Sequence, residues 1–430
     1  MSSQHPNRNL VLYFQVHQPR RLNTLSFFDI GSSGSYFNDD LNKEIIRRVA
    51  RQCYLPTNAL LLKLIKKYPQ LKVVFSVSGV TIDQFEESAP EVLSSFRKLA
   101  ATGSVEFLSE TYYHSLACMI QGDEFETQVM KHAEKVHEHF NVQPGVFRNT
   151  ELIYNDEIGK RVSMMGFEGI LTEGTEVITA RHPAHYLYEH PDKNNLKIFL
   201  RNYRLSDDIA FRFKDFKLTA EKYMSWLKAM PQEDIVVTLG MDYETFGEHH
   251  KPESGIHKFL ESLLTAIAKQ SDLTMITLSE AARALKPKET LSVPEHISWA
   301  DQERDLSAWL GNDMQRDSFY TVCRMEQSVK SMNDPELLKQ WRYLLTSDHF
   351  YYMSTKKSSD GSVHSYFSPY PSPYEAFINF MNVIADFSIH VKNLQEASLE
   401  KASQLSEEER QKQNVPPTWA MTTGHAHYGH

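Results

Sequence analysis

The chain has 430 residues, of which 41% are hydrophobic and 23% are charged, and its formal net charge is −9. This length allows a large core and more than one domain, and the composition is that of an ordinary globular protein. The acidic balance argues against nucleic-acid binding, which normally uses a basic surface. The sequence has no apolar stretch of about 18 residues, so it predicts no membrane span.

The cysteines and the first residues indicate a cellular location. Cys53, Cys118 and Cys323 are widely separated, and they form no CxxC pair. A low, odd number of cysteines is typical of free thiols in a reducing compartment rather than of disulfides or a zinc site. The opening sequence MSSQHPNRN lacks the apolar core of a signal peptide. We therefore expect a cytoplasmic protein with no metal and no other cofactor.

Strands and helices are predicted to alternate from the N-terminus onward. Residues 10–16 form a continuous apolar run, which is typical of a strand buried on both faces of a parallel sheet. Apolar residues at helical spacing follow over 56–68. The same rhythm then predicts further strands at 72–77, 105–108, 146–148, 169–171, 196–200, 235–239 and 274–276.

This alternation predicts βα units around a parallel sheet. Seven or eight strands within about 285 residues favour a closed barrel, although an open doubly wound sheet is the competing topology. A nucleotide-binding open sheet should carry a Gly-rich phosphate loop after an early strand, and the sequence has no such motif. We therefore expect an α/β barrel over residues 1–286, with its chemistry where the strands end.

The pattern changes after residue 286. A polar connector with two prolines covers 286–294. Helical patterns then cover 315–331, 335–352 and 373–402. We expect a helical domain over 287–403 that packs on the barrel and a mobile tail over 404–430. The tail ends in GHAHYGH, whose histidines could bind a metal, but a mobile tail is the simpler interpretation.

Polar and charged side chains gather just after the predicted strands. Carboxylates that gather at one end of a barrel require a functional explanation, because burying an unpaired charge costs free energy. Cleavage of a glycosidic bond supplies one, since two carboxyl groups must flank the bond. Taken singly, each residue is more often a helix cap, an ion-pair partner or a packing residue. The residues at the strand ends are His17, Gln18, Glu106, Glu110, His114, Glu151, Glu173, Asp242, Glu244 and His249.

A metal-dependent hydrolase on a barrel of related shape is an alternative. Such an enzyme needs clustered His and Asp ligands. No two histidines have the i, i+4 spacing of a helical zinc motif, and the first strand ends in HQP without an Asp. The residues therefore give this alternative little support.

Five motifs resemble those of glycoside hydrolase family 57, the α-amylase and 4-α-glucanotransferase family. They are HQP at His17, GSVEF at Gly103 with His114 downstream, FRNTEL at Phe147, MDYETFG at Met241 and WLGNDMQ at Trp309. The set is spread over about 300 residues, and five motifs in order are far more specific than any one of them.

The resemblance implies a (β/α)7 barrel, an incomplete relative of the eight-stranded TIM barrel, and a helical domain that closes the cleft. It also implies that Glu151 is the nucleophile and Asp242 the acid/base of a reaction that retains anomeric configuration. The third motif begins with Trp in many members, whereas Phe147-Arg148-Asn149 here fits the amylase-like branch better than the branching-enzyme branch. The candidate sugar-binding residues are His17, Gln18, Glu106, His114, Glu244, His249, Trp309 and Asp313.

These features predict hydrolysis of α-1,4 linkages in an α-glucan or malto-oligosaccharide by double displacement. The two carboxyl groups are expected about 5–5.5 Å apart, the separation of retaining enzymes. Asp242 is expected to have a raised pKa, because it must be protonated in the first step. Two alternatives stay open: a 4-α-glucanotransferase with the same active site, and a non-catalytic glucan-binding or regulatory protein on the same scaffold.

Overall fold

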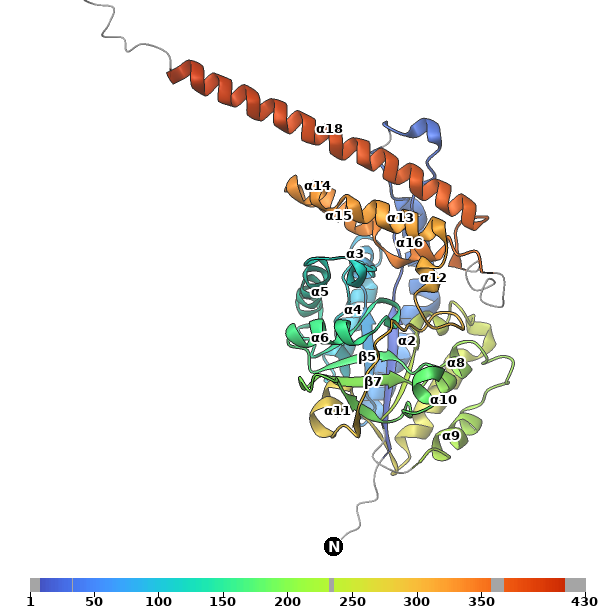
Figure 1. The fold of residues 1–430 in the computed structure, drawn as a ribbon. Helices are drawn as coiled ribbons and strands as arrows, with labels where there is room; N and C mark the ends of the chain where they lie inside the picture. The colour runs from blue at the N-terminus through green and yellow to red at the C-terminus, as the bar shows by residue number, and fades with distance from the viewer. Residues whose placement is uncertain (1–7, 33, 232–235, 357–366, 414–430) are drawn as a thin grey trace, which may run out of the picture.

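The computed structural model describes residues 8–32, 34–231, 236–356 and 367–413. Strands and helices alternate through the first two thirds of the chain, and helices alone make up the rest (Figure 1). Among the described residues, no helix is both long and apolar enough to cross a membrane.

Seven parallel strands close into a ring within the described part of the chain. β1 pairs with β8 along one edge and with β2 along the other, and the ring continues through β3, β4, β5 and β7 back to β8. A short bridge between Ser109 and Phe147 joins β3 to β4. This is the predicted (β/α)7 barrel. Its strands are β1 (Arg8–Val16), β2 (Val73–Val77), β3 (Val105–Phe107), β4 (Val146–Arg148), β5 (Gly169–Glu173), β7 (Lys197–Arg201) and β8 (Val236–Asp242).

The strand predicted at 274–276 is not an eighth member of the ring. It forms β9 (Leu273–Met275), which pairs with the first three residues of β1. Because β8 occupies one edge of β1, β9 lies on the other edge, just before the point where β2 begins to pair. Two further strands, β6 (Leu187–Glu189) and β10 (Glu289–Thr290), extend the sheet from β7, with β6 antiparallel to it.

The apolar run of β1 is continuous because both of its faces are buried. Val11 and Tyr13 point into the barrel, where they join a cluster that includes Val74, Leu108 and Leu171. The alternate residues of β1 pack outward against the surrounding helices. A half-exposed strand would instead alternate apolar and polar residues.

Helices surround the barrel on its outer side (Figure 1). Short 3-10 or π segments also follow several strands and helices. The barrel helices are α1 (Asp39–Val49), α2 (Leu55–Lys67), α3 (Gly79–Ser88), α4 (Pro90–Ala100), α5 (Glu124–Phe140), α6 (Asp156–Met164), α7 (Glu176–Thr179), α8 (Tyr203–Ala210), α9 (Ala220–Lys228), α10 (Ile256–Ala268) and α11 (Leu278–Ala284).

Helix α11 lies at the end of the barrel from which β1 begins (Figure 1). Leu278 and Ala281 of this helix belong to the cluster inside the barrel. Its first backbone N–H groups, those of Leu278 and Ser279, donate to the Glu106 carboxylate at 2.7 and 3.2 Å. Glu106 therefore caps α11, where unpaired N–H groups and the helix dipole favour a negative charge.

The C-terminal helices lie over the opposite end of the barrel, where the strands end (Figure 1). The segments predicted as single helices over 315–331 and 335–352 are each broken into two. α18 continues past residue 403, so only 414–430 of the expected tail lie outside the described residues. The domain boundary at 286 stays a prediction. The helices are α12 (Ser307–Leu310), α13 (Asp313–Arg324), α14 (Glu326–Ser331), α15 (Pro335–Leu344), α16 (Ser347–Tyr351) and α18 (Pro373–Gln413).

Replacing Glu106 by Ala should lower the free energy of unfolding by about 1.5–3 kcal/mol, because N–H groups at the start of α11 lose a charged acceptor. Urea unfolding followed by circular dichroism measures this. Glu168→Ala is the matched control, since Glu168 only pairs with the exposed Arg283, and such pairs contribute about 0–1 kcal/mol. Unchanged stability in Glu106→Ala would contradict the capping role.

Candidate active site

A pocket of about 800 Å³ lies where the barrel strands end, beneath the C-terminal helices. Its walls include residues that follow β1, β4 and β8, residues of α8, and residues of α16. Most of the residues singled out from the sequence therefore share one cavity. Those that line it are His17, Gln18, His114, Glu151, Asp242, Glu244 and His249.

Three residues expected to bind sugar do not line this pocket. Glu106 caps α11 at the other end of the barrel. Trp309 is fully buried in the core of the C-terminal helices, where its ring packs against Tyr351. The Asp313 side chain is 100% exposed and pairs with Arg316. The structure does not bring these three side chains to the pocket, and their role in sugar binding stays a prediction.

Glu151 has an unusual backbone conformation just after β4. Its φ is 56°, and that of the next residue, Leu152, is 54°. Non-glycine residues reach this left-handed region at a cost of about 1–3 kcal/mol, and such residues concentrate at functional sites. The carbonyl of Glu151 accepts a hydrogen bond from the Trp299 N–H at 3.1 Å, which fixes the turn from a distant loop. The backbone, rather than a rotamer alone, thus directs this carboxylate.

Both carboxylate oxygens of Glu151 accept hydrogen bonds. Trp299 donates its indole N–H to Oε2 at 2.6 Å. The other oxygen, Oε1, contacts His114 Nε2 at 3.2 Å and accepts from the Ser347 hydroxyl at 3.2 Å. The donors come from three separate parts of the chain: the loop after β3, the segment before α12, and the start of α16. The group is therefore held in one orientation.

His114 lies between two carboxylates. Its Nδ1 is 2.9 Å from Glu110 Oε2, and its Nε2 faces Glu151. Burial opposes a charge on this ring, but the hydrogen bonds to Glu110 and Glu151 outweigh burial and raise its pKa to about 9. Both ring nitrogens then carry protons, because ionised carboxylates only accept. His114 is therefore an imidazolium at neutral pH.

The same contacts keep the two acids ionised. Burial alone would raise the pKa of Glu110, but the hydrogen bond from His114, its charge and the charge of Arg148 together lower it to about 2. Burial also acts to raise the pKa of Glu151, and the hydrogen bond from His114 reverses this, so its pKa falls below the usual value. Glu151 is thus an anion under ordinary conditions.

His17 stacks on His114 with ring centroids 3.8 Å apart. Burial and the charge of His114 lower the pKa of His17, so this second ring is neutral. Its Nε2 lies 3.0 Å from Asp348 Oδ2 and its Nδ1 lies 2.7 Å from the Ser78 hydroxyl. Since the carboxylate only accepts, Nε2 carries the ring proton and Nδ1 accepts from Ser78. His17 thereby links the barrel to α16.

Asp242, the last residue of β8, has the opposite protonation behaviour to Glu151. Burial, followed by the negative charge of Glu151, raises its pKa to about 6. Glu244, two residues on, has a pKa raised to about 8 by burial and by Asp242. Tyr54 and Gln18 both donate to its Oε1. The pocket therefore holds Glu151 as an anion together with two carboxyl groups, Asp242 and Glu244, whose pKa values are raised.

The carboxylate of Glu173, a rival candidate by position, is taken up by ion pairs. Arg201 and Arg304 each donate to its Oε2, at 2.8 and 2.9 Å. Both arginines also pair with Asp207 of α8. This network joins β5, β7 and α8 to the segment that carries Trp299. Glu173 thus supports the pocket wall rather than facing a ligand.

Three residues that contact Glu151 or His17 were not found from the sequence. Trp299 and Ser347 donate to Glu151, and Asp348 binds His17. None follows a barrel strand, so a search at strand ends could not find them. The sequence offers one local signal, because Thr346-Ser347-Asp348 places three polar residues between two apolar stretches.

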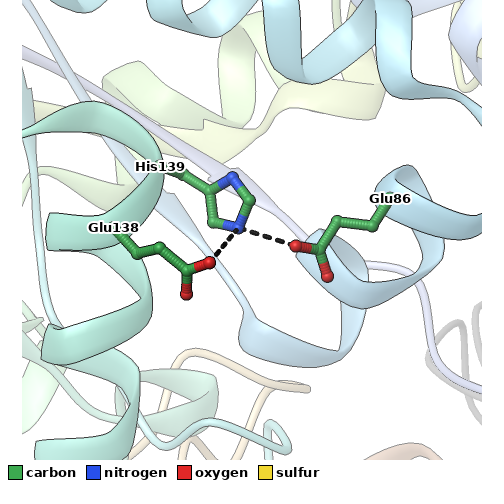
Figure 2. Close-up of side chains that lie close together, drawn as sticks. All are labelled: Glu86, Glu138 and His139. Atoms are coloured by element: carbon green, nitrogen blue, oxygen red, sulfur yellow. Dashed lines mark ion pairs between the residues drawn. The ribbon is translucent and has the colours of Figure 1, made fainter.

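A further group of possible metal ligands, Glu86, Glu138 and His139, lies outside the pocket (Figure 2). Nε2 of His139 faces both carboxylates, at 2.9 and 4.0 Å. Arg97 donates to the other ring nitrogen, Nδ1, at 2.8 Å. Nδ1 must therefore accept, which leaves the proton on Nε2 and no lone pair there for a metal. Lys135 also pairs with Glu86 at 2.9 Å, so the group is an ion-pair cluster.

Comparison with known proteins decides the family. The model of glycosyl hydrolase family 57 matches residues 11–294, which is the barrel and the segment after it. The chain belongs to this family. It is therefore a glycosidase- or transferase-type enzyme of the α-amylase-like kind.

A curated protein of Methanocaldococcus jannaschii named "Putative alpha-amylase" is 43% identical over 406 residues, which cover 90% of this chain and 85% of that protein. Among solved structures, a branching enzyme from Pyrococcus horikoshii has a TM-score of 0.64 at 15% identity, with 83% of this chain and 86% of that one covered. The 4-alpha-glucanotransferase from Thermococcus litoralis has a TM-score of 0.63 at 17% identity. The match covers 80% of this chain but 56% of that longer protein. At these identities the solved structures show the fold alone.

Replacing Ser347 by Ala should lower kcat about tenfold and leave KM nearly unchanged, because a donor to the charged Glu151 is lost. Steady-state kinetics on malto-oligosaccharides measures both constants. Ser318→Ala is the matched control, since Ser318 is a buried hydroxyl among methionines of the C-terminal helices. Equal kinetics in the two variants would show that α16 does not act on Glu151.

Proposed function

We propose that this protein is a retaining α-glucan glycosidase that hydrolyses α-1,4 linkages, with Glu151 as nucleophile and Asp242 as acid/base. The observation that carries the proposal is the unequal protonation of two carboxyl groups in one pocket. The pKa of Glu151 is lowered, whereas that of Asp242 is raised to about 6. Double displacement needs this division, one anion and one acid, at the start of the reaction.

In the first step, Asp242 donates its proton to the glycosidic oxygen while a Glu151 oxygen attacks C1 of the sugar. The C1–O bond to the leaving sugar breaks, and a bond between C1 and Glu151 forms. The negative charge that leaves Glu151 had raised the pKa of Asp242. When that charge is lost, the pKa of Asp242 falls. Asp242 therefore stays ionised after it has given up its proton, and it can act as the base in the second step.

In the second step, the Asp242 carboxylate takes a proton from water, and the water oxygen attacks C1. The bond to Glu151 breaks, and its returning charge is received by donors already in place, His114, Ser347 and Trp299. Preorganised donors of this kind lower the barrier because they need no reorientation as charge develops. The expected separation of about 5–5.5 Å between the two carboxyl groups stays a prediction.

A sugar hydroxyl could replace water in the second step, which would make the enzyme a 4-α-glucanotransferase. The pocket offers an aromatic surface for an acceptor sugar, since Tyr203, Tyr351 and Phe367 line it together with the catalytic pair. Aromatic rings stack on sugar faces. The choice between acceptors depends on how well this surface excludes water, and both reactions share the first step. An α-glucan or malto-oligosaccharide substrate and a cytoplasmic location remain part of the proposal.

Incubation with maltoheptaose, followed by chromatography of the products, tests the proposal. Glucose, maltose and other short products alone indicate hydrolysis, whereas a ladder that includes chains longer than the substrate indicates transfer. Binding of maltoheptaose without any new reducing ends or products would instead support a non-catalytic glucan-binding protein.

Glu151→Gln and Asp242→Asn should each lower turnover of maltoheptaose by at least about 100-fold, since each removes a group that must exchange charge or a proton. Asp242→Asn should lose much less on an aryl glycoside with a good leaving group, which needs little protonation. Asp313→Asn, an exposed site off the pocket, is the matched control. Wild-type turnover in both carboxylate variants would overturn the assignment.

The pH profile of kcat/KM should have its optimum on the acid side of neutral. Asp242 acts in its protonated form, so activity is present below its pKa of about 6 and falls as pH rises through that value. Glu151 acts as an anion, so activity falls again only below its lowered pKa. Measurement on a short malto-oligosaccharide between pH 3 and pH 9 gives both limbs, roughly a bell-shaped curve. A rate that keeps rising above neutral pH would contradict the role of Asp242.

A further inference from the structure

Arg148, the last residue of β4, is a buried charge that the steps above do not use. Its side chain has no exposed surface. All three side-chain nitrogens lack a hydrogen-bond partner among the residues that the structure describes. Burying a guanidinium costs free energy unless an opposite charge or a polar partner compensates it. Arg148 does not line the pocket, so contact with a sugar does not explain it.

One line of contacts leads from Arg148 to the first oxygen of Glu151. The NH1 nitrogen lies 3.6 Å from Glu110 Oε2. The same Glu110 oxygen contacts His114 at 2.9 Å, and His114 reaches Glu151 Oε1 at 3.2 Å. The guanidinium therefore forms an ion pair with the oxygen of Glu110 that orients the histidine behind the proposed nucleophile, while Ser76 and Gln15 donate to the other oxygen.

A second line leads to the other oxygen of Glu151. The Arg148 guanidinium lies over the Trp299 ring, 5.3 Å from its centroid, as does that of Arg201 at 5.4 Å. The same indole donates to Glu151 Oε2 at 2.6 Å, and the Trp299 backbone N–H donates to the Glu151 carbonyl. Cations over an indole face fix the plane of the ring, and the plane fixes where its N–H points.

We propose that Arg148 is a positioning residue for Glu151, and that its single guanidinium orients both carboxylate oxygens through two separate arms, Glu110–His114 and Trp299. This inference rests on the proposed function, in which Glu151 is the nucleophile. It extends that function, because it assigns the preorganisation of the nucleophile to a residue that touches neither substrate nor the reacting atoms.

The charge of Arg148 also acts on both members of the pair. It lowers the pKa of Glu151, Asp242 and Glu110. Its removal should therefore move both limbs of the pH profile to higher pH, which a purely structural residue would not do. The other charged or titratable groups that face Glu151 or Asp242 from the packed elements are His114 after β3, Arg201 of β7, Glu244 after β8 and Asp348 of α16.

Two variants separate the charge from the shape of the guanidinium. Arg148→Met removes both, so kcat should fall about 100-fold, as expected for a displaced reacting group, and both limbs should shift upward. Arg148→Lys keeps the charge but loses the planar face over the indole. It should keep the wild-type limbs and still lose kcat. KM should change little in either variant, since Arg148 does not line the pocket.

Arg161→Met is the matched control. Arg161 also lies over an aromatic ring, that of Phe125 at 4.7 Å, and also pairs with a carboxylate, Glu126, but it is remote from the pocket. Its kcat and pH limbs should stay those of the wild type. If Arg148→Met does not fold, Arg148→Lys alone decides the positioning role. Wild-type kcat in the folded Lys variant would overturn it.

A double-mutant cycle with Trp299→Phe tests the second arm. Phe keeps a ring near the guanidinium but has no N–H for Glu151. If Arg148 acts through Trp299, the losses in kcat from Arg148→Lys and Trp299→Phe should combine to less than their product. Fully multiplicative losses would overturn this arm. Turnover that survives Glu151→Gln would refute the proposed function, whereas an inactive Glu151→Gln with normal Arg148 variants would refute only this inference.

Discussion

The imidazole of His114 lies between Glu110 and Glu151, and its positive charge allows two acids to be ionised inside the protein. Without a cation between them, burial would favour the protonated form of both. The charge of His114 also lowers the pKa of the stacked His17 ring, which stays neutral. Its Nδ1 can therefore accept from Ser78 while its Nε2 donates to Asp348. The contacts of both Glu151 and His17 therefore depend on this one bridge.

The bridge also explains why two carboxyl groups in one pocket behave differently. His114 donates directly to Glu151, whereas its charge is only a minor influence on Asp242. Asp242 is left with burial and the charge of its neighbour, and both favour its protonated form. A direct hydrogen bond and a more distant charge therefore divide the roles of nucleophile and acid between groups of the same chemistry.

The barrel could be predicted from unbroken apolar runs in the sequence, because a strand that is buried on both faces carries apolar residues at successive positions. The ends of these runs offer several carboxylates, and only the resemblance to the family motifs singles out Glu151 and Asp242 among them. Glu106 was singled out in the same way, but its carboxylate lies at the end of the barrel closed by α11. Trp299 and Ser347 come from a connector and a helix start, where no periodic pattern marks a side chain that reaches the pocket.

The left-handed turn at Glu151 has a consequence for anyone who wishes to transplant this site. The carbonyl of Glu151 is held by the backbone of Trp299, and its carboxylate by the ring of the same residue. A strand and its following turn, moved alone to another barrel, would relax to an ordinary conformation and aim the carboxylate elsewhere. The smallest transferable unit is therefore discontinuous, because it must include a loop from beyond the end of the barrel.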